Sequence, residues 1–206
     1  MYKVIFFLFL LIPLGAVSSN LMLLKSSKTQ VVFFKDANNN TFSLNQNILK
    51  KANSTYPSLA FNSVPILSYM SRYSSNLKDY NLAIEQLLEG LNYNPYNTYS
   101  LYLLASNYIY IDELKEAKKV LDKAYKLSPN IESIAALYFT VLAETKQTNQ
   151  LIDIFKSVKL SNNITIWKFY IGSLLNTNII NNIDKEFLSK VEIESFNLFK
   201  QNILEN

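Results

Sequence analysis

The sequence has no cysteine and no histidine, and its 206 residues include three glycines. Without cysteine the chain has no disulfide, no thiolate metal site and no cysteine nucleophile. Without histidine it has no serine–histidine triad and lacks the usual ligand of zinc and haem sites. Gly15, Gly90 and Gly172 lie too far apart to form a phosphate-binding loop or a dinucleotide fingerprint. We therefore expect no metal ion and no cofactor.

Charge is also scarce in this chain. Charged residues make up 17% of it, the formal net charge is +4, and Arg72 is its single arginine. One arginine and so small a net charge would give little phosphate neutralisation, which argues against nucleic-acid binding. The acidic residues fall close together in helix-like segments, as Glu85 and Glu89 do, which is typical of a solvated surface rather than of two carboxylates converging in a cleft. We expect no enzymatic activity.

The longest apolar run lies at the N-terminus. Residues 4–17 are fourteen consecutive residues without a charged or hydrophilic side chain, and Leu21–Leu24 resume the run before Lys25. A signal peptide needs about 7–15 apolar residues and an uncleaved transmembrane helix about 20, so residues 1–24 fit a membrane anchor or a signal peptide. The resumed run favours the anchor. The short lead before the run favours export, so we expect the rest of the chain on the extracytoplasmic side of a bacterial cell envelope, with the cytoplasmic side as the alternative.

The rest of the chain repeats with a period of 34 residues. A shift of this length aligns Ala83 with Ala117, Leu87 with Leu121, Gly90 with Ala124 and Pro95 with Pro129. Self-similarity at one fixed period is typical of stacked supersecondary units. Apolar residues within each unit recur at helical spacing, so each unit is predicted to be two helices, with the proline ending the second one.

The small residues have a packing role in this prediction. Ala83 and Ala117 are expected where the two helices of a unit cross, because a methyl group lets the helix axes approach to about 8–10 Å. Gly90 is expected to serve the contact with the next unit. A run of lysines and acids on the second helix of the second unit indicates a solvated outer face with ion pairs such as Asp122–Lys126.

This pattern resembles the tetratricopeptide repeat, a helix–turn–helix unit with small residues and a terminal proline at fixed places. The matching residues of the first unit are Leu67, Met70, Ser71, Ala83, Leu87, Gly90 and Pro95. Those of the second unit are Leu101, Leu104, Ala105, Tyr108, Ala117, Leu121, Ala124 and Pro129. The first unit lacks the family's large aromatic residue, at Ser74. A third unit, from Glu132, departs from the family pattern at Leu151 and Asn163.

The resemblance implies an all-α fold, in which an N-terminal membrane helix precedes an α-solenoid of tetratricopeptide-like helical hairpins. We expect a degenerate helical repeat or linker at residues 25–63 and two well-formed units at 64–131. Degenerate repeats and capping helices are expected at 132–206.

Helices can also be predicted outside the two well-formed units. Residues 26–35 and 42–53 form the helices of the degenerate repeat in this interpretation, although the run Val31–Phe34 is equally compatible with a short strand. A last pair of helices is predicted at 164–175 and 184–204.

The resemblance further implies where a partner binds. The first helices of such repeats line a concave groove that holds a peptide or a helix, so we expect a protein or peptide partner along that face. The family's groove positions fall in this chain on Arg72, Asn76, Tyr99, Tyr102, Ser106, Tyr110, Thr140 and Glu144. Arg72 and Asn76 alone suit a clamp for a peptide carboxylate. The tyrosines suit amphipathic contact with a partner instead.

The predicted function is therefore a membrane-anchored scaffold for protein–protein interaction without chemistry of its own. Two alternatives stay open. An apolar span followed by degenerate repeats also resembles the tails of bacterial O-antigen ligase and polymerase proteins, which would make this chain an accessory or C-terminal part of a surface-polysaccharide system. If signal peptidase removes the apolar N-terminus, the chain would instead be a secreted, soluble repeat protein.

Overall fold

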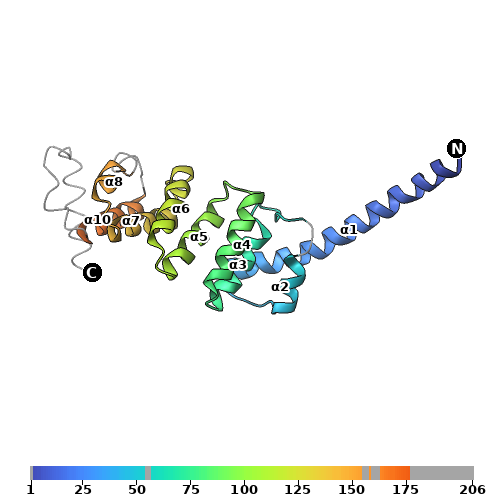
Figure 1. Cartoon of the computed structure of the whole chain (residues 1–206), viewed down its shortest axis with the longest axis horizontal. Helices are drawn as coiled ribbons and strands as arrows, with labels where there is room; N and C mark the ends of the chain where they lie inside the picture. Colours follow the sequence, from blue (N-terminus) through green and yellow to red (C-terminus); the bar gives the residue numbers. More distant parts are fainter. Residues whose placement is uncertain (1, 54–56, 155–157, 159–162, 177–206) are drawn as a thin grey trace. The chain divides into compact units, whose positions relative to one another are not determined.

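A computed structural model describes residues 2–53, 57–154, 158 and 163–176. Within these ranges the chain is helical and forms no sheet, and Leu59 and Pro65 pair in an isolated antiparallel bridge. The helices, shown in Figure 1, are α1 (Tyr2–Asn39), α2 (Gln46–Asn53), α3 (Ile66–Asn76), α4 (Tyr80–Tyr93), α5 (Thr98–Tyr110), α6 (Leu114–Leu127), α7 (Glu132–Glu144), α8 (Thr148–Asp153) and α10 (Ile164–Asn176). The predicted all-α fold is confirmed. The chain divides into two compact units, residues 1–100 and 101–206, and the boundary falls within α5.

The turn between the two helices of a pair repeats with the predicted period. Residues at intervals of 34 have a left-handed backbone conformation, with φ of 62° at Lys78, 62° at Asp112 and 55° at Lys146. The residue after each of them donates its backbone N–H to a carbonyl five residues earlier. These bonds join Asp79 to Ser74, Glu113 to Tyr108 and Gln147 to Leu142, and each has an N···O distance of 2.9 Å. The period of the sequence is therefore also a period of the backbone, and it extends to the pair α7 and α8.

In the first unit, α3 packs against α4 through the small residues of the repeat. Ala83 and Leu87 on α4 are fully buried. A Cβ atom added to Gly90 would lie 3.1 Å from Cβ of Pro65 and 3.4 Å from Cβ of Leu67. The three atoms nearest to that Cβ belong to the start of α3, so Gly90 serves the contact within its own pair, and the expected contact with the next unit stays a prediction. A residue without a side chain lets α4 lie close to the start of α3.

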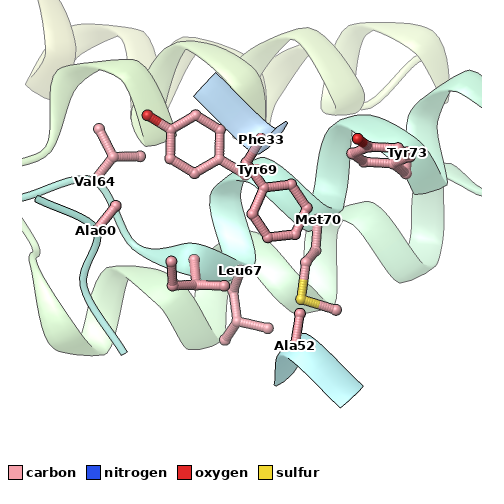
Figure 2. Packing of buried hydrophobic residues seen from close by; sticks show 9 residues of the cluster. Phe33, Ala52, Ala60, Val64, Leu67, Tyr69, Met70 and Tyr73 are labelled. Carbon is pink, nitrogen blue, oxygen red and sulfur yellow. The ribbon is translucent and has the colours of Figure 1, made fainter. Parts of the chain in front are cut away.

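The segment before the first repeat is helical and joins the core of this unit. Helix α1 continues through Val31–Phe34, so the helical interpretation of this run is confirmed and the strand is wrong. The buried ring of Phe33 stacks on Tyr69 at 5.8 Å and meets Tyr73 edge-on at 5.9 Å between ring centroids. Figure 2 shows the resulting cluster of Phe33, Ala52, Ala60, Val64, Leu67, Tyr69, Met70 and Tyr73. Helix α2 begins at Gln46, later than the predicted residue 42.

The earlier part of α1 differs from the part that joins the core. Residues 15–25 are all exposed, and burial begins at Ser26 and continues on the same side at Gln30 and Phe33. Among the residues that the structure describes, no helix combines the length and the apolarity needed to cross a membrane. The membrane helix expected within residues 1–24 is not confirmed by the structure and stays a prediction.

In the second unit, α7 lies against α6, α8 and α10. Ala117 is fully buried on α6, and Leu151 on α8 is fully buried as well, so the third pair takes a larger side chain where the family has alanine. Asn163 stands where the family ends a helix with proline, and its Oδ1 instead accepts the backbone N–H of Thr165 at 2.9 Å at the start of α10. The helix predicted at 164–175 is present as α10, whereas the one at 184–204 lies outside the described residues.

Candidate functional site

The predicted groove residues lie on α3, α5 and α7. Among them, the side chain of Arg72 is engaged within the fold. Its Nη2 donates to Oδ1 of Asn40 at 3.0 Å, and its guanidinium lies 5.6 Å from the centre of the Phe42 ring. A cation at this distance over an aromatic face is attracted by the ring quadrupole. Arg72 thus fastens the segment after α1 to α3, which is not the carboxylate clamp considered from the sequence.

Two further predicted residues, Asn76 and Tyr99, belong to the first unit. Tyr99 is half-buried, and its ring lies 6.1 Å from that of Tyr69, against the core cluster of Figure 2. Asn76 is exposed at the end of α3. Of the predicted groove residues in this unit, Arg72 and Tyr99 are half-buried and Asn76 is exposed.

In the second unit, three predicted residues fall on one side of α5. Tyr102, Ser106 and Tyr110 follow one another at intervals of four, so their side chains lie one above the other on the helix. Tyr110 is 66% exposed, while Tyr102 and Ser106 are half-buried. The Ser106 hydroxyl donates to the carbonyl of Tyr102 at 3.0 Å. We call these three residues the tyrosine face of α5. It combines apolar rings with polar tips.

The predicted residues on α7 are polar. Thr140 and Glu144 are exposed and lie one turn apart, and Glu144 is the last residue of the helix. The Thr140 hydroxyl donates to the carbonyl of Ala136 at 2.9 Å. This side of α7 offers hydrogen-bonding groups and a charge, with no aromatic ring among the predicted residues.

The first unit also contains a cavity of about 440 Å³ that sequence reasoning missed. Its lining comes from α2, α3, α4 and the turn between α3 and α4, and it includes Leu49, Met70, Ser74, Leu77, Leu82 and Gln86. The Ser74 hydroxyl donates to Oε1 of Gln86 at 2.9 Å, which joins α3 to α4 beside the cavity. Ser74 is the position at which the first repeat lacks the family's aromatic residue. That departure was the signal for the cavity.

Asp36 is a buried carboxylate that ties α1 to α3. It is 2% exposed and accepts hydrogen bonds from the hydroxyl of Tyr73, the backbone N–H of Ser43 at 2.8 Å and the hydroxyl of Thr41 at 2.8 Å. Burial by itself raises the pKa of Asp36, but these bonds to the charged form outweigh it and lower the pKa from 3.8 to about 2. Burial and the bond to Asp36 raise the pKa of Tyr73. Because its oxygens are engaged inside the fold, Asp36 has a structural role.

Asp122 has a similar role in the second unit. It accepts hydrogen bonds from the hydroxyl of Tyr138 at 2.7 Å and from Nε2 of Gln150 at 3.0 Å, and it pairs with Nζ of Lys118 at 3.0 Å. Burial raises the pKa of Asp122, but these partners lower it overall. The expected pair with Lys126 is wrong. The carboxylate of Asp122 accepts from Tyr138, and Lys118, which lies one turn earlier on α6, pairs with it instead. Neither aspartate joins a metal-binding cluster, since the described residues contain no group of three ligating side chains.

Comparison with known families identifies the pair α5 and α6. The family model of the tetratricopeptide repeat matches residues 98–131, which hold both helices. The chain carries a tetratricopeptide repeat. The tyrosine face therefore lies on the first helix of this tetratricopeptide repeat, and the turn at Asp112 that recurs at Lys78 and Lys146 is the turn between its two helices.

The other comparisons are more distant. None of the curated proteins matches the chain. Among solved structures it is similar to the first tetratricopeptide repeat domain of Spaghetti (RPAP3) bound to the HSP90 peptide SRMEEVD, with 11% sequence identity and a TM-score of 0.40 over 71% of this chain and 98% of that one. At this score the similarity supports no conclusion about what this chain binds.

Proposed function

We propose that this tetratricopeptide repeat protein is a scaffold that binds a protein or peptide partner and has no chemistry of its own. The observation that carries the proposal is the tyrosine face of α5, inside the matched repeat. Tyr110 leaves 66% of its surface exposed, and Tyr102 lies on the same side of the helix. Tyrosine is among the residues that most often anchor protein interfaces, since it brings a large rigid apolar area and a polar tip.

The charges on α6 favour a contact through α5. Lys119 and Glu116 are 3.7 Å apart, and their side chains are 79% and 48% exposed. Hydrated pairs of this kind contribute roughly 0–1 kcal/mol and form the rim of an interface more often than its centre. The aromatic side of the repeat is therefore the better anchor.

We also propose that residues 4–24 hold the scaffold at a membrane, with the repeats on the extracytoplasmic side. Support comes from the uninterrupted apolar run of residues 4–17 and from the side chains that follow it on α1. Leu21, Met22, Leu23 and Leu24 are 42–56% exposed, and an apolar stretch left in water is stabilised when lipid or protein covers it. The secreted form and the cytoplasmic orientation are the alternatives. A role in a surface-polysaccharide system has no support among the comparisons.

Site-specific photocrosslinking tests the scaffold. A photoreactive phenylalanine at position 102 or 110 in living cells should form an adduct with one defined second protein. The same residue in place of Lys115, which is exposed on α6, should form none. Adducts from position 115 alone would place the partner on α6 and refute binding through the tyrosine face.

N-terminal sequencing and fractionation test the anchor. We expect the chain to remain with the membrane fraction and to keep its apolar N-terminus. A mature chain that begins after residue 17 would support the secreted form, and an intact chain found wholly in the soluble fraction would refute the anchor.

A further inference from the structure

The cavity of the first unit adjoins a position at which the other repeats have a large side chain. The turns place Ser74, Tyr108 and Leu142 at the same position of three successive repeats, because each accepts a backbone N–H from the residue five positions later at 2.9 Å. Leu142 is fully buried and Tyr108 is half-buried. Ser74 is buried too, but it fills far less space, and the cavity opens beside it. The first repeat therefore lacks one large side chain of its own.

The walls of the cavity correspond to the surroundings of Tyr108. Burial raises the pKa of Tyr108, and the charges of Glu116 and Glu113 raise it further, so both carboxylates act on this phenol. The residues 34 positions before them are Leu82 and Asp79, and both line the cavity. Two lining residues of the cavity thus stand at the repeat positions of the two carboxylates whose charges act on Tyr108.

The size and chemistry of the cavity also fit an aromatic ring. Its volume is about 440 Å³, whereas an aliphatic cavity of about 150 Å³ is enough to take up benzene. Met70 and Leu82 contribute apolar wall, and the thioether of Met70 suits contact with a ring. Lys50 adds a cation to the lining, and Gln86 adds an amide. A phenyl or phenol group would find both apolar and polar contacts there.

The cavity is open to water, and two of its exposed lining residues are leucines. Leu77 and Leu82 line it and are 60% and 41% exposed. A side chain that entered from outside would cover these two leucines with its own backbone, which adds to the apolar area removed from water.

We propose that this cavity receives an aromatic side chain of a partner protein or peptide, which completes the first repeat as Tyr108 completes the second. The proposal rests on the scaffold function proposed above and adds a contact of stated chemistry on α3 and α4. It involves no covalent step. The ring enters and leaves reversibly, and its selectivity is for aromatic over aliphatic side chains.

NMR titration of the full-length chain in lipid nanodiscs tests the proposal with side-chain analogues. The probes are N-acetyl-tyrosinamide and N-acetyl-phenylalaninamide, and N-acetyl-leucinamide is the aliphatic control. Both aromatic probes should shift the backbone amide signals of Met70, Ser74 and Leu82 saturably at about millimolar concentration, as expected for ligands of this size. The leucine probe should shift them at least several-fold more weakly.

Variants locate the binding. Ser74→Tyr should abolish the shifts, because the added ring occupies the cavity. Asn81→Tyr adds the same ring at an exposed position of α4 outside the lining and should leave the titration unchanged. Leu82→Asn, at the exposed mouth, should weaken the binding several-fold without filling the cavity and covers the case in which Ser74→Tyr fails to fold.

Three results would overturn the proposal. These are the absence of saturable shifts in the natural chain, undiminished shifts in a folded Ser74→Tyr or in Leu82→Asn, and tighter binding of the leucine probe. None of them would alter photocrosslinking through positions 102 and 110. Failure of the aromatic site is therefore distinguishable from failure of the scaffold function.

Discussion

Asp36 offers a direct test of how the first unit is held together. Its pKa is about 2 in the folded chain against an ordinary 3.8, because hydrogen bonds from Tyr73, Ser43 and Thr41 to the carboxylate outweigh its burial. At about 1.4 kcal/mol for each pKa unit, this difference corresponds to about 2 kcal/mol of folding stability at neutral pH. Because the folded pKa is lowered, this stability is fully present above about pH 5 and is lost as the pH falls through the unfolded and then the folded pKa. About half of it remains at pH 3.

The substitution Asp36→Asn measures this contribution. It places an amide that donates hydrogen bonds against the donors of Tyr73 and Ser43, and we expect the free energy of unfolding to fall by about 2 kcal/mol at pH 7 and by about 1 kcal/mol at pH 3. Urea unfolding followed by the NMR signals of α3 amides reports on the first unit alone. Glu89→Gln, on an exposed carboxylate of α4, is the matched control and should change stability by less than about 0.5 kcal/mol. Equal effects of Asp36→Asn at both pH values, or an effect no larger than the control's, would refute the reasoning.

Helix packing and partner contact give three further expected outcomes. Ala117→Leu should cost about 1–3 kcal/mol, because Ala117 is fully buried, whereas Lys115→Leu, exposed on the same helix, should be nearly neutral. The fluorescence of the single tryptophan, which belongs to the same unit, measures both, and equal shifts would mean that the repeat register is wrong. Gly172→Ala should raise the free energy of unfolding by about 0.5–1 kcal/mol, since an added Cβ meets no atom within 4 Å. Gly90→Ala should raise it less, since its Cβ would lie 3.1 Å from Cβ of Pro65. Melting curves that show a larger gain in stability for Gly90→Ala than for Gly172→Ala would contradict this expectation. Tyr102→Ala should weaken the affinity for the crosslinked partner by about fivefold or more, and Lys115→Ala should leave it unchanged, as a titration with the purified partner will show.

The helix pairs could be predicted from the sequence because their constraint is local and repeated. A small residue lets two helices approach closely where they cross, and Ala83 and Ala117 stand at these positions, both fully buried. The turns between the helices carry no such signal. Lys78 and Asp112 adopt a φ of 62° there, although glycine is the residue that usually marks this conformation. The period located these turns, whereas their residue types would not have.

The contacts of the N-terminal segment could not be predicted, because they join distant residues and follow no period. Asp36 begins a polar stretch that has the composition of a solvated loop, and its burial becomes visible only when Tyr73 is seen to donate to it. Arg72 was placed in the groove by its position in the repeat. Position alone does not reveal that Asn40 and Phe42 lie across its side chain.

The tyrosines of α5 show how far helical periodicity can define a binding site. Tyr99 and Tyr110 are eleven residues apart, which at 3.6 residues per turn places them within about 20° of one another around the helix. Periodicity thus assigns both to one side, together with Tyr102 and Ser106. It does not show where along the helix that side is covered. Tyr99, in the first turn, packs against Tyr69, whereas Tyr110, in the last turn, is 66% exposed. A partner that uses this side of α5 is therefore confined to its later turns, and for this reason Tyr102 and Tyr110, not Tyr99, are the positions at which crosslinking and substitution decide the function.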